Sequence, residues 1–397
     1  MVTTLQDYSN IRYRTTANDA YGGVVRVMVD GYYGTGSLLF GGQAVLTSAH
    51  IFNNTTSNKA NVLINGITYS ASHTIHQEYN VTNDNNDLAL LWLEKAPPPQ
   101  IQRYDIYRTS DEITKEFTMV GYGALGYGSV GAIYENDKLV KLKAQNRFDA
   151  DFADIKAALG GQMQWNPQKK TQLAADFDNG RSANDALGII LSQHDLGLGL
   201  DEGFIAAGDS GGPAFIDGKI AGVASYTARL SLTASPLDID ELNNSSFGEI
   251  ASWQRVSYYQ EWIDKSLREH YKDLPLTPAD VKKSIQEGDA GAIDYVYFLL
   301  EFRGKRESVD GVLSVTYSTR DATAVSGEDY IATSGTVVLY EDENYAFIPV
   351  EIIGDNEQEE DEFFYLDVYN PIGGSFAEGI VKLTATRTIL DNDTLLF

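Results

Sequence analysis

Apolar and polar residues alternate in short runs along the first two thirds of the chain, and turn residues separate these runs. Residues 24–29 alternate in this way, and residues 36–46 form a pair of short apolar runs punctuated by glycine. Residues 121–128 make a turn region rich in glycine and tyrosine. Such spacing predicts an all-β barrel or sandwich. Residues 147–200 are less regular, and we expect one short helix over 151–159 and otherwise largely loops.

The last third of the chain alternates more clearly. Apolar residues occupy every second position in 313–317, 346–352, 364–368 and 381–385, which predicts strands with one buried face. About seven strands in roughly 120 residues are typical of a β-sandwich of immunoglobulin-like size. Pro349 interrupts one of these strands, so we expect an edge position or a bulge there.

Between these two regions, apolar residues recur at helical spacing from Gln254 to Tyr271 and predict an amphipathic helix. A linker follows, in which Thr277 can cap a short helical turn that starts at Pro278. We therefore predict two domains, residues 1–275 and 276–397.

Charge changes the picture of possible partners. The chain has 397 residues and a net charge of −26, and residues 277–397 alone hold 24 acidic against 8 basic residues. This acidity argues against a nucleic-acid partner, because phosphate binding requires a cationic surface. It is compatible with bound cations, although a solvated acidic surface is the simpler interpretation of composition alone.

Cysteine usage and apolar runs limit the class of protein further. The chain has no cysteine, which excludes disulfides and thiolate metal sites. No run of 18 apolar residues occurs, so we expect no membrane span. The first ten residues lack a basic region followed by an apolar stretch. Either the protein is not exported, or its signal peptide is absent from this sequence.

Three motifs supply an imidazole, a carboxylate and a hydroxyl, in that order. They are Leu-Thr-Ser-Ala-His at 46–50, Asp-Leu-Ala-Leu-Leu at 87–91 and Gly-Asp-Ser-Gly-Gly-Pro at 208–213. Acyl transfer by a serine needs a nucleophile, a base and an acidic group that orients the base. A glycine-rich turn also lets backbone amides converge on an oxyanion.

These motifs resemble those of the chymotrypsin/trypsin-like serine proteases over roughly residues 20–270. The resemblance implies a double β-barrel with a C-terminal helix and an active site in the cleft between the barrels. It implies that Ser210 is the nucleophile, His50 the base and Asp87 the group that orients His50. The backbone amides of Gly208 and Ser210 would then form the oxyanion hole.

The resemblance leaves a choice between two aspartates for the orienting group, and it leaves the partner of a third aspartate open. Asp84 lies in the same polar loop as Asp87, and we favour Asp87 because only it directly precedes the apolar run 88–92. No convincing activation sequence occurs near the start of the chain. The partner of Asp209, which pairs with a new N-terminus in the family, is therefore left open.

The resemblance also places a substrate pocket at Phe204, Ser225 and Thr227. Phe204 would be the pocket floor and Thr227 part of its wall, and Ser225 would hydrogen-bond near Asp87. An apolar floor argues against preference for Arg or Lys, because a buried cation needs a charged partner. Two alternatives stay open: Phe204 belongs to the core, or Asp238 or Asp240 reaches the pocket.

Residues 283–397 resemble Calx-β domains, the calcium-binding modules of sodium/calcium exchangers and many bacterial surface proteins. The matching segments are Glu287-Gly288-Asp289, 327–330, 359–363 and 389–393. The resemblance implies Ca²⁺ ligands at six acidic positions, and oxygen ligands of this kind suit calcium. These positions are Glu287, Asp329, Asp355, Glu359, Asp391 and Asp393.

Departures from the pattern leave a purely structural acidic rim as the alternative. Gly354 stands where the family often has aspartate, and Asn392 interrupts an acidic triplet. In the first domain, residues 176–180 (Asp-Phe-Asp-Asn-Gly) look like a calcium loop. They lack its full spacing and its closing glutamate, and we interpret them as a turn.

The sequence as a whole favours a secreted bacterial serine endopeptidase with an accessory calcium-binding domain. Its expected partners are protein or peptide substrates and calcium ions, with no cofactor for catalysis. The alternative is a trypsin-fold protein that has lost activity and serves in adhesion or binding.

Overall fold

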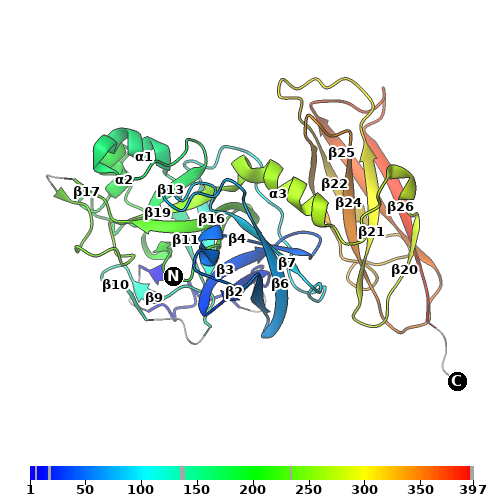
Figure 1. Cartoon of the computed structure of the whole chain (residues 1–397), viewed down its shortest axis with the longest axis horizontal. Coiled ribbons are helices and arrows are strands. Elements are labelled where there is room, and N and C mark those ends of the chain that lie inside the picture. Colours follow the sequence, from blue (N-terminus) through cyan, green and yellow to red (C-terminus); the bar gives the residue numbers. More distant parts are fainter. Residues whose placement is uncertain (5–6, 17–18, 135–138, 233–234, 394–397) are drawn as a thin grey trace. The chain divides into compact units, whose positions relative to one another are not determined.

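The computed structural model describes residues 1–4, 7–16, 19–134, 139–232 and 235–393. These residues form two compact units, which are coloured along the chain in Figure 1. The first unit comprises residues 1–39, 44–95 and 102–260, and the second comprises 40–43, 96–101 and 261–397. The division falls inside a helix, and the domain limits at 275 and 276 stay a prediction.

The first unit begins with a closed barrel whose strand order is β2-β3-β4-β7-β6-β5. The valines of 24–29 line the inside of this barrel, because Val25, Val27 and Val29 are buried. Its strands are β2 (Val24–Val29), β3 (Tyr32–Leu38), β4 (Ala44–Thr47), β5 (Lys59–Ile64), β6 (Ile67–Ile75) and β7 (Ala89–Leu93).

A second, curled sheet follows in the order β11-β8-β15-β16-β19-β13-β12. Aromatic packing fills its core: the Phe117 and Phe148 rings stack at 4.0 Å, and Trp253 meets Phe117 edge-on at 5.0 Å. Its strands are β8 (Glu116–Gly121), β11 (Leu142–Arg147), β12 (Ala150–Asp151), β13 (Gln172–Asp176), β15 (Pro213–Ile216), β16 (Lys219–Ala228) and β19 (Ile250–Arg255).

Shorter elements complete the first unit. One small sheet has the order β10-β9-β1-β14, and β17 pairs with β18. The strands are β1 (Val2–Thr3), β9 (Leu125–Tyr127), β10 (Gly131–Tyr134), β14 (Gly203–Phe204), β17 (Ser231–Leu232) and β18 (Ser235–Pro236). The 3-10 turns are η1 (Ala49–Phe52), η2 (Gly160–Gln162) and η3 (Gly199–Asp201).

Residues 147–200 contain more regular structure than the sequence predicts. The expected helix is present as α1 (Phe152–Leu159), and the Asp151 carboxylate caps it by accepting the Ala153 N–H. Strand β13 and helix α2 (Ala186–Leu191) were missed. All five residues of β13 are buried, so the strand has no alternation that a sequence pattern could reveal.

Helix α3 (Val256–His270) matches the helix predicted from Gln254. Its Tyr259 and Ile263 are buried, as the helical spacing of apolar residues predicts. The predicted helical turn is η4 (Pro278–Asp280), which Thr277 closes with a reciprocal capping box.

The second unit contains the expected β-sandwich. Its sheets have the orders β20-β26-β25-β22-β23 and β21-β24, and the Tyr330 and Phe364 rings stack in its core at 4.3 Å. Pro349 lies in β24, which pairs along its length with β21 and, among the described residues, bridges Tyr330 on its other side at Ile352, so Pro349 itself lies at an edge position as predicted. The strands are β20 (Ser284–Gln286), β21 (Ile293–Glu301), β22 (Leu313–Arg320), β23 (Ser334–Leu339), β24 (Tyr345–Ile353), β25 (Glu362–Ile372) and β26 (Lys382–Leu390).

The alternation predicted for 381–385 does not mark a core face. Val381 and Leu383 are exposed, and the buried residues of β26 are Arg387 and Ile389. The Arg387 guanidinium donates to the Tyr297 carbonyl and lies over the Phe298 ring, which lets a charged side chain occupy a core position. The predicted all-β class, a double barrel followed by a sandwich, is otherwise confirmed.

Candidate active site

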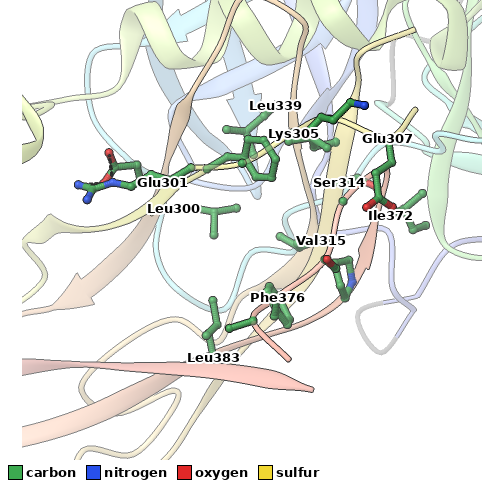
Figure 2. A pocket seen from close by; sticks show the side chains of 18 residues that line it. Leu300, Glu301, Lys305, Glu307, Ser314, Val315, Leu339, Ile372, Phe376 and Leu383 are labelled. Carbon is green, nitrogen blue, oxygen red and sulfur yellow. Dashed lines mark hydrogen bonds and ion pairs between the residues drawn. The ribbon is translucent and has the colours of Figure 1, made fainter. Parts of the chain in front are cut away.

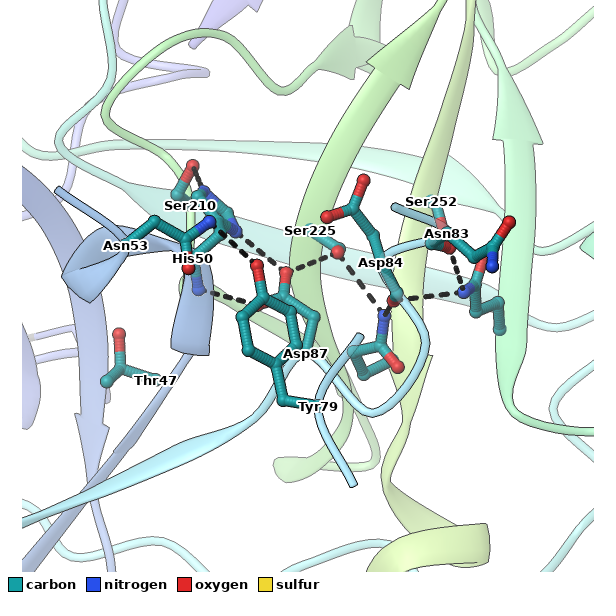
Figure 3. Close-up of polar contacts among 12 residues, drawn as sticks. Thr47, His50, Asn53, Tyr79, Asn83, Asp84, Asp87, Ser210, Ser225 and Ser252 are labelled. Carbon is teal, nitrogen blue, oxygen red and sulfur yellow. Dashed lines mark hydrogen bonds and ion pairs between the residues drawn. The ribbon is translucent and has the colours of Figure 1, made fainter. Parts of the chain in front are cut away.

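Three elements distant in sequence bring His50, Asp87 and Ser210 together (Figure 3). His50 lies in η1, directly after β4 of the first barrel. Asp87 ends the loop before β7, and Ser210 lies in the turn between β14 and β15. The imidazole therefore comes from the first barrel and the hydroxyl from the segment that enters the second sheet.

The three side chains form one hydrogen-bonded row. His50 Nδ1 lies 2.7 Å from Asp87 Oδ2, and His50 Nε2 lies 2.7 Å from Ser210 Oγ. The His50 side chain is 27% exposed, whereas that of Asp87 is fully buried. His50 and Ser210 also line a small surface pocket with Tyr32, Tyr33 and Ile51. The row is thus open to solvent at its hydroxyl end and closed at its carboxylate end.

Hydrogen bonds hold the Asp87 carboxylate from several directions. Asp87 Oδ1 accepts the His50 backbone N–H at 2.7 Å, and Oδ2 accepts the Ser225 hydroxyl at 2.5 Å. Gln254 Nε2 donates in turn to Ser225 Oγ at 3.3 Å. Burial alone would raise the pKa of Asp87, but the His50 charge and these hydrogen bonds outweigh it and lower the pKa.

Asp87 also controls the titration of His50. Burial by itself lowers the pKa of the imidazole, but the Asp87 carboxylate favours the protonated form more strongly. The net result is a His50 pKa above its ordinary value of 6.5. Asp84, the competing carboxylate, does not contact His50, and burial together with the Asp87 charge raises its own pKa to about 6.

The turn around Ser210 depends on glycine at two positions. Gly208 has φ +92° and Gly211 has φ +81°, and side chains rarely tolerate either. A Cβ at Gly211 would also lie 2.1 Å from Thr47 Oγ1. In the same turn, the N–H groups of Asp209, Gly211 and Gly212 donate to backbone carbonyls. Among the described residues, those of Gly208 and Ser210 have no such partner, so both remain available as donors.

Asp209, whose partner the sequence left open, is buried and fully engaged. Its Oδ1 accepts the Gly123 N–H at 2.7 Å and its Oδ2 accepts the Ala206 N–H at 3.0 Å. Oδ2 also lies 2.8 Å from the amino group of Met1. These contacts fix the chain on both sides of Asp209, directly before Ser210.

The expected pocket floor is wrong. Phe204 is fully buried and stacks on Phe177 at 5.3 Å, so it belongs to the core of the second sheet. Its position on β14, paired with Val2, turns the side chain into that core. Ser225 hydrogen-bonds Asp87 as the resemblance implies. The core alternative considered for Phe204 is the one that the structure has.

Thr227 does line a surface hollow, whose lining is partly aromatic and partly charged. Asp84, Arg229 and Glu241 also line it. Asp238 does not line this hollow, because it is buried, accepts the Ser246 hydroxyl and lies 3.2 Å from Arg229. Asp240 is used locally and accepts the Leu242 N–H.

In the second unit, the acidic residues expected to bind calcium gather in two groups. Carboxylate oxygens of Glu287, Asp355 and Asp393 lie within 4.8 Å of one another, and so do those of Asp329, Glu359 and Glu362. Asp391 contacts the second of these groups, because its carboxylate accepts the Glu359 N–H at 3.3 Å.

Glu362 belongs to one of these groups but was not predicted as a calcium ligand. It lies in the acidic run 359–363, of which only Glu359 was predicted. Strand β25 begins at Glu362, and this start of the strand brings its carboxylate to Asp329. Burial and the neighbouring carboxylates raise the pKa of Glu362 to about 7 and that of Glu287 to about 7.

A separate pocket in the sandwich has both apolar and charged side chains in its lining. Figure 2 shows Leu300, Val315, Leu339, Ile372 and Phe376 around it, and Glu301, Lys305 and Glu307 also line it. None of the predicted calcium ligands lines this pocket. It is therefore a feature distinct from the acidic groups.

Comparison with known proteins agrees with both parts of this architecture. The trypsin family model matches residues 14–151, which include His50 and Asp87 but end before Ser210. The Calx-beta domain model matches residues 298–393. The chain thus carries a trypsin-like domain followed by a C-terminal Calx-beta domain, and both resemblances are confirmed.

Curated relatives match a short part of the chain. The sodium/calcium exchanger Calx of Drosophila melanogaster is 34% identical over 92 residues, which cover 22% of this chain and 9% of the exchanger. Sodium/calcium exchanger 2 of Rattus norvegicus and of Homo sapiens is 36% identical over 92 residues, covering 20% of this chain and 10% of each exchanger. The chain therefore spans about a tenth of the length of these relatives.

Among the described residues, none of the helices has the length and apolar character that a membrane span requires.

The coupling between Asp87 and His50 can be measured without any assay of activity. We expect Asp87→Asn to move the His50 pKa from above 6.5 to below it, because burial would then outweigh the small remaining contribution of Asp84. NMR titration of labelled histidines measures this shift. Asp84→Asn is the matched control, since Asp84 makes the smallest contribution to the raised pKa and should cause a much smaller fall. An unchanged His50 pKa in Asp87→Asn would contradict the assignment.

Proposed function

We propose that the protein is a serine endopeptidase that hydrolyses peptide bonds through an acyl-enzyme on Ser210. The observation that carries this proposal is the row Asp87–His50–Ser210, with 2.7 Å at each link. The trypsin-like fold of the first domain supports the same reaction class.

The chemistry follows from the positions of the three groups. As Ser210 Oγ attacks the scissile carbonyl carbon, His50 Nε2 takes the hydroxyl proton, and Asp87 stabilises the resulting imidazolium. The carbonyl oxygen becomes an oxyanion that the N–H groups of Gly208 and Ser210 can bind. His50 then gives the proton to the leaving amine, and the C–N bond breaks.

Deacylation reverses these roles with water in place of the amine. His50 removes a proton from water, and the hydroxide oxygen attacks the acyl carbon. When the second tetrahedral intermediate collapses, Ser210 Oγ leaves and recovers the proton from His50. The products are a carboxylate, an amine and the free enzyme.

Substitution of the nucleophile tests the proposal directly. We expect Ser210→Ala to lower kcat on a casein substrate by about 10⁶-fold, because the acyl-enzyme can no longer form. The variant should also escape labelling by a fluorophosphonate probe. Ser72→Ala, at an exposed position of β6, is the matched control and should behave like the parent. A parent that is neither labelled nor active would favour the alternative, an inactive trypsin-fold protein that serves in binding or adhesion.

The pH dependence follows from the sign of the His50 shift. His50 must be neutral to accept a proton, and its pKa lies above 6.5. We therefore expect kcat/KM to fall on acidification at a higher pH than an ordinary histidine would give. A pH profile with an uncharged peptide substrate measures this. An acid limb centred below 6.5 would contradict it.

We further propose that the Calx-beta domain binds calcium and that the protein is exported. The acidic groups fit a cation, because Glu287 Oε1 and Asp393 Oδ2 are buried without a hydrogen-bond partner among the described residues. Glu287, Asp329, Asp355, Glu359, Asp391 and Asp393, together with Glu362, would hold the ions. Calcium would neutralise these carboxylates and tie the loops at one end of the sandwich together. Weak carboxylate sites of this kind are filled at the calcium levels found outside cells.

Hydrogen exchange can test calcium binding where it is proposed. We expect saturating calcium to slow exchange in peptides that cover residues 287–292, 353–363 and 389–393 of the full chain, relative to chelator. The Asp329→Asn, Asp355→Asn double variant should lose this protection. Glu378→Gln, an exposed acid of the same unit outside both groups, is the control and should keep it. Equal exchange of the parent in calcium and in chelator would refute the proposal.

A further inference from the structure

A third group of carboxylates lies within the trypsin-like domain. Asp176 ends β13, Asp178 follows two residues later, and Asp185 directly precedes α2. Carboxylate oxygens of all three lie within 4.8 Å of one another. Each of the three residues is at most 4% exposed, so this group is far more buried than those of the sandwich.

More acidic residues than basic ones surround this group. The charges of Asp149, Asp195 and Glu202 act on its members. The basic side chains that meet these acids are Arg147, which pairs with Asp195, and His194, whose Nδ1 lies 2.9 Å from Asp185 Oδ2. Neither contacts Asp178.

Existing hydrogen bonds use some of the oxygens and leave others free. Asp176 Oδ2 accepts the Leu187 N–H and Asp185 Oδ1 accepts the Gly188 N–H, both at 2.7 Å. Glu202 accepts the N–H groups of Asp178 and Leu198. These bonds fix the backbone around the group, but they do not neutralise its charge.

Asp178 is the residue of this group whose buried carboxylate lacks compensating contacts. Its side chain is buried, and its Oδ1 has no hydrogen-bond partner among the described residues. Its charged neighbours are the carboxylates of Asp176, Glu202, Asp185 and Asp149. A buried carboxylate in such surroundings needs either a proton or a cation.

We propose that Asp176, Asp178 and Asp185 form a calcium site within the trypsin-like domain. Two oxygens that share one Ca²⁺ at 2.3–2.6 Å can lie at most about 5 Å apart, and the three carboxylates meet this limit. All three ligands are hard oxygen donors of the kind that calcium prefers. The five-residue segment 176–180 is thus half of a site that Asp185 completes from the start of α2.

A bound ion would balance the charge of these buried carboxylates and add to the contacts between the segments that carry them. It would join the end of β13 to α2, and Glu202 links Asp178 to the stretch that leads through β14 to the Ser210 turn. The site lies outside the Calx-beta domain, and calcium could bind there whether or not the protein is a peptidase.

The test uses the full chain and compares Asp178→Asn with Asp154→Asn, an exposed acid on α1. Calcium binding is counted by equilibrium dialysis with ⁴⁵Ca²⁺. We expect Asp178→Asn to bind one calcium fewer than the parent, and Asp154→Asn to bind the same number. Loss of protection in the sandwich peptides alone would not produce this difference, so the two calcium proposals can fail separately.

Hydrogen exchange and melting separate a ligand from a merely structural residue. Calcium should slow exchange in peptides that cover residues 177–202 of the parent but not of Asp178→Asn. In chelator, Asp178→Asn should melt no lower than the parent, because it removes a buried charge that lacks a partner. A variant that keeps the parent's calcium number, or that loses the same stability in chelator and in calcium, would overturn the site. If Asp178→Asn does not fold, Asp185→Asn in the same assays decides between these outcomes.

Discussion

The buried carboxylate of Asp87 is the interaction on which the candidate active site depends. It is fully buried, so its charge is tolerable only if nearby groups replace the water that it has lost. His50 supplies both a backbone N–H and an imidazole nitrogen, and Ser225 supplies a hydroxyl. One charge therefore fixes η1, the loop before β7 and strand β16 relative to one another. The orientation of His50 is a consequence of satisfying this carboxylate.

The same constraint has two other outcomes in this chain. Asp209 is also buried, and backbone N–H groups and the Met1 amino group surround it, so the turn at Ser210 is anchored by a satisfied anion. Asp178 has its charge facing other carboxylates and no donor at Oδ1. The difference lies in the neighbours: Asp87 and Asp209 meet donors from other segments of the chain, whereas Asp178 meets acids. A buried carboxylate therefore orders the chain around it only where hydrogen-bond donors or cations surround it.

Much of the fold and of the candidate active site could be predicted from the sequence, and the predictions that were wrong or absent have physical causes. The order of the His50, Asp87 and Ser210 motifs and the alternation in the sandwich reflect local residue patterns, and both domains followed from them. Strand β13 was missed because burial on both faces removes alternation. Phe204 was wrongly predicted as the pocket floor. The resemblance gives its position in the chain, but not the face of β14 on which its side chain lies. Residues 176–180 were interpreted as a turn because Asp185 and Glu202 meet Asp178 only after residues 177–202 have folded.

Burial also separates the two kinds of acidic group that the chain contains. In the sandwich, Asp355, Glu359 and Asp393 are at least partly exposed, so water and salt can screen much of their repulsion without any ion. In the trypsin-like domain, Asp176, Asp178 and Asp185 are all buried, and salt cannot reach them to the same extent. An acidic rim on the surface can therefore exist as an ordinary solvated feature. A buried group of three carboxylates with an unpaired oxygen cannot, because each of its charges must be removed by a proton or matched by a cation.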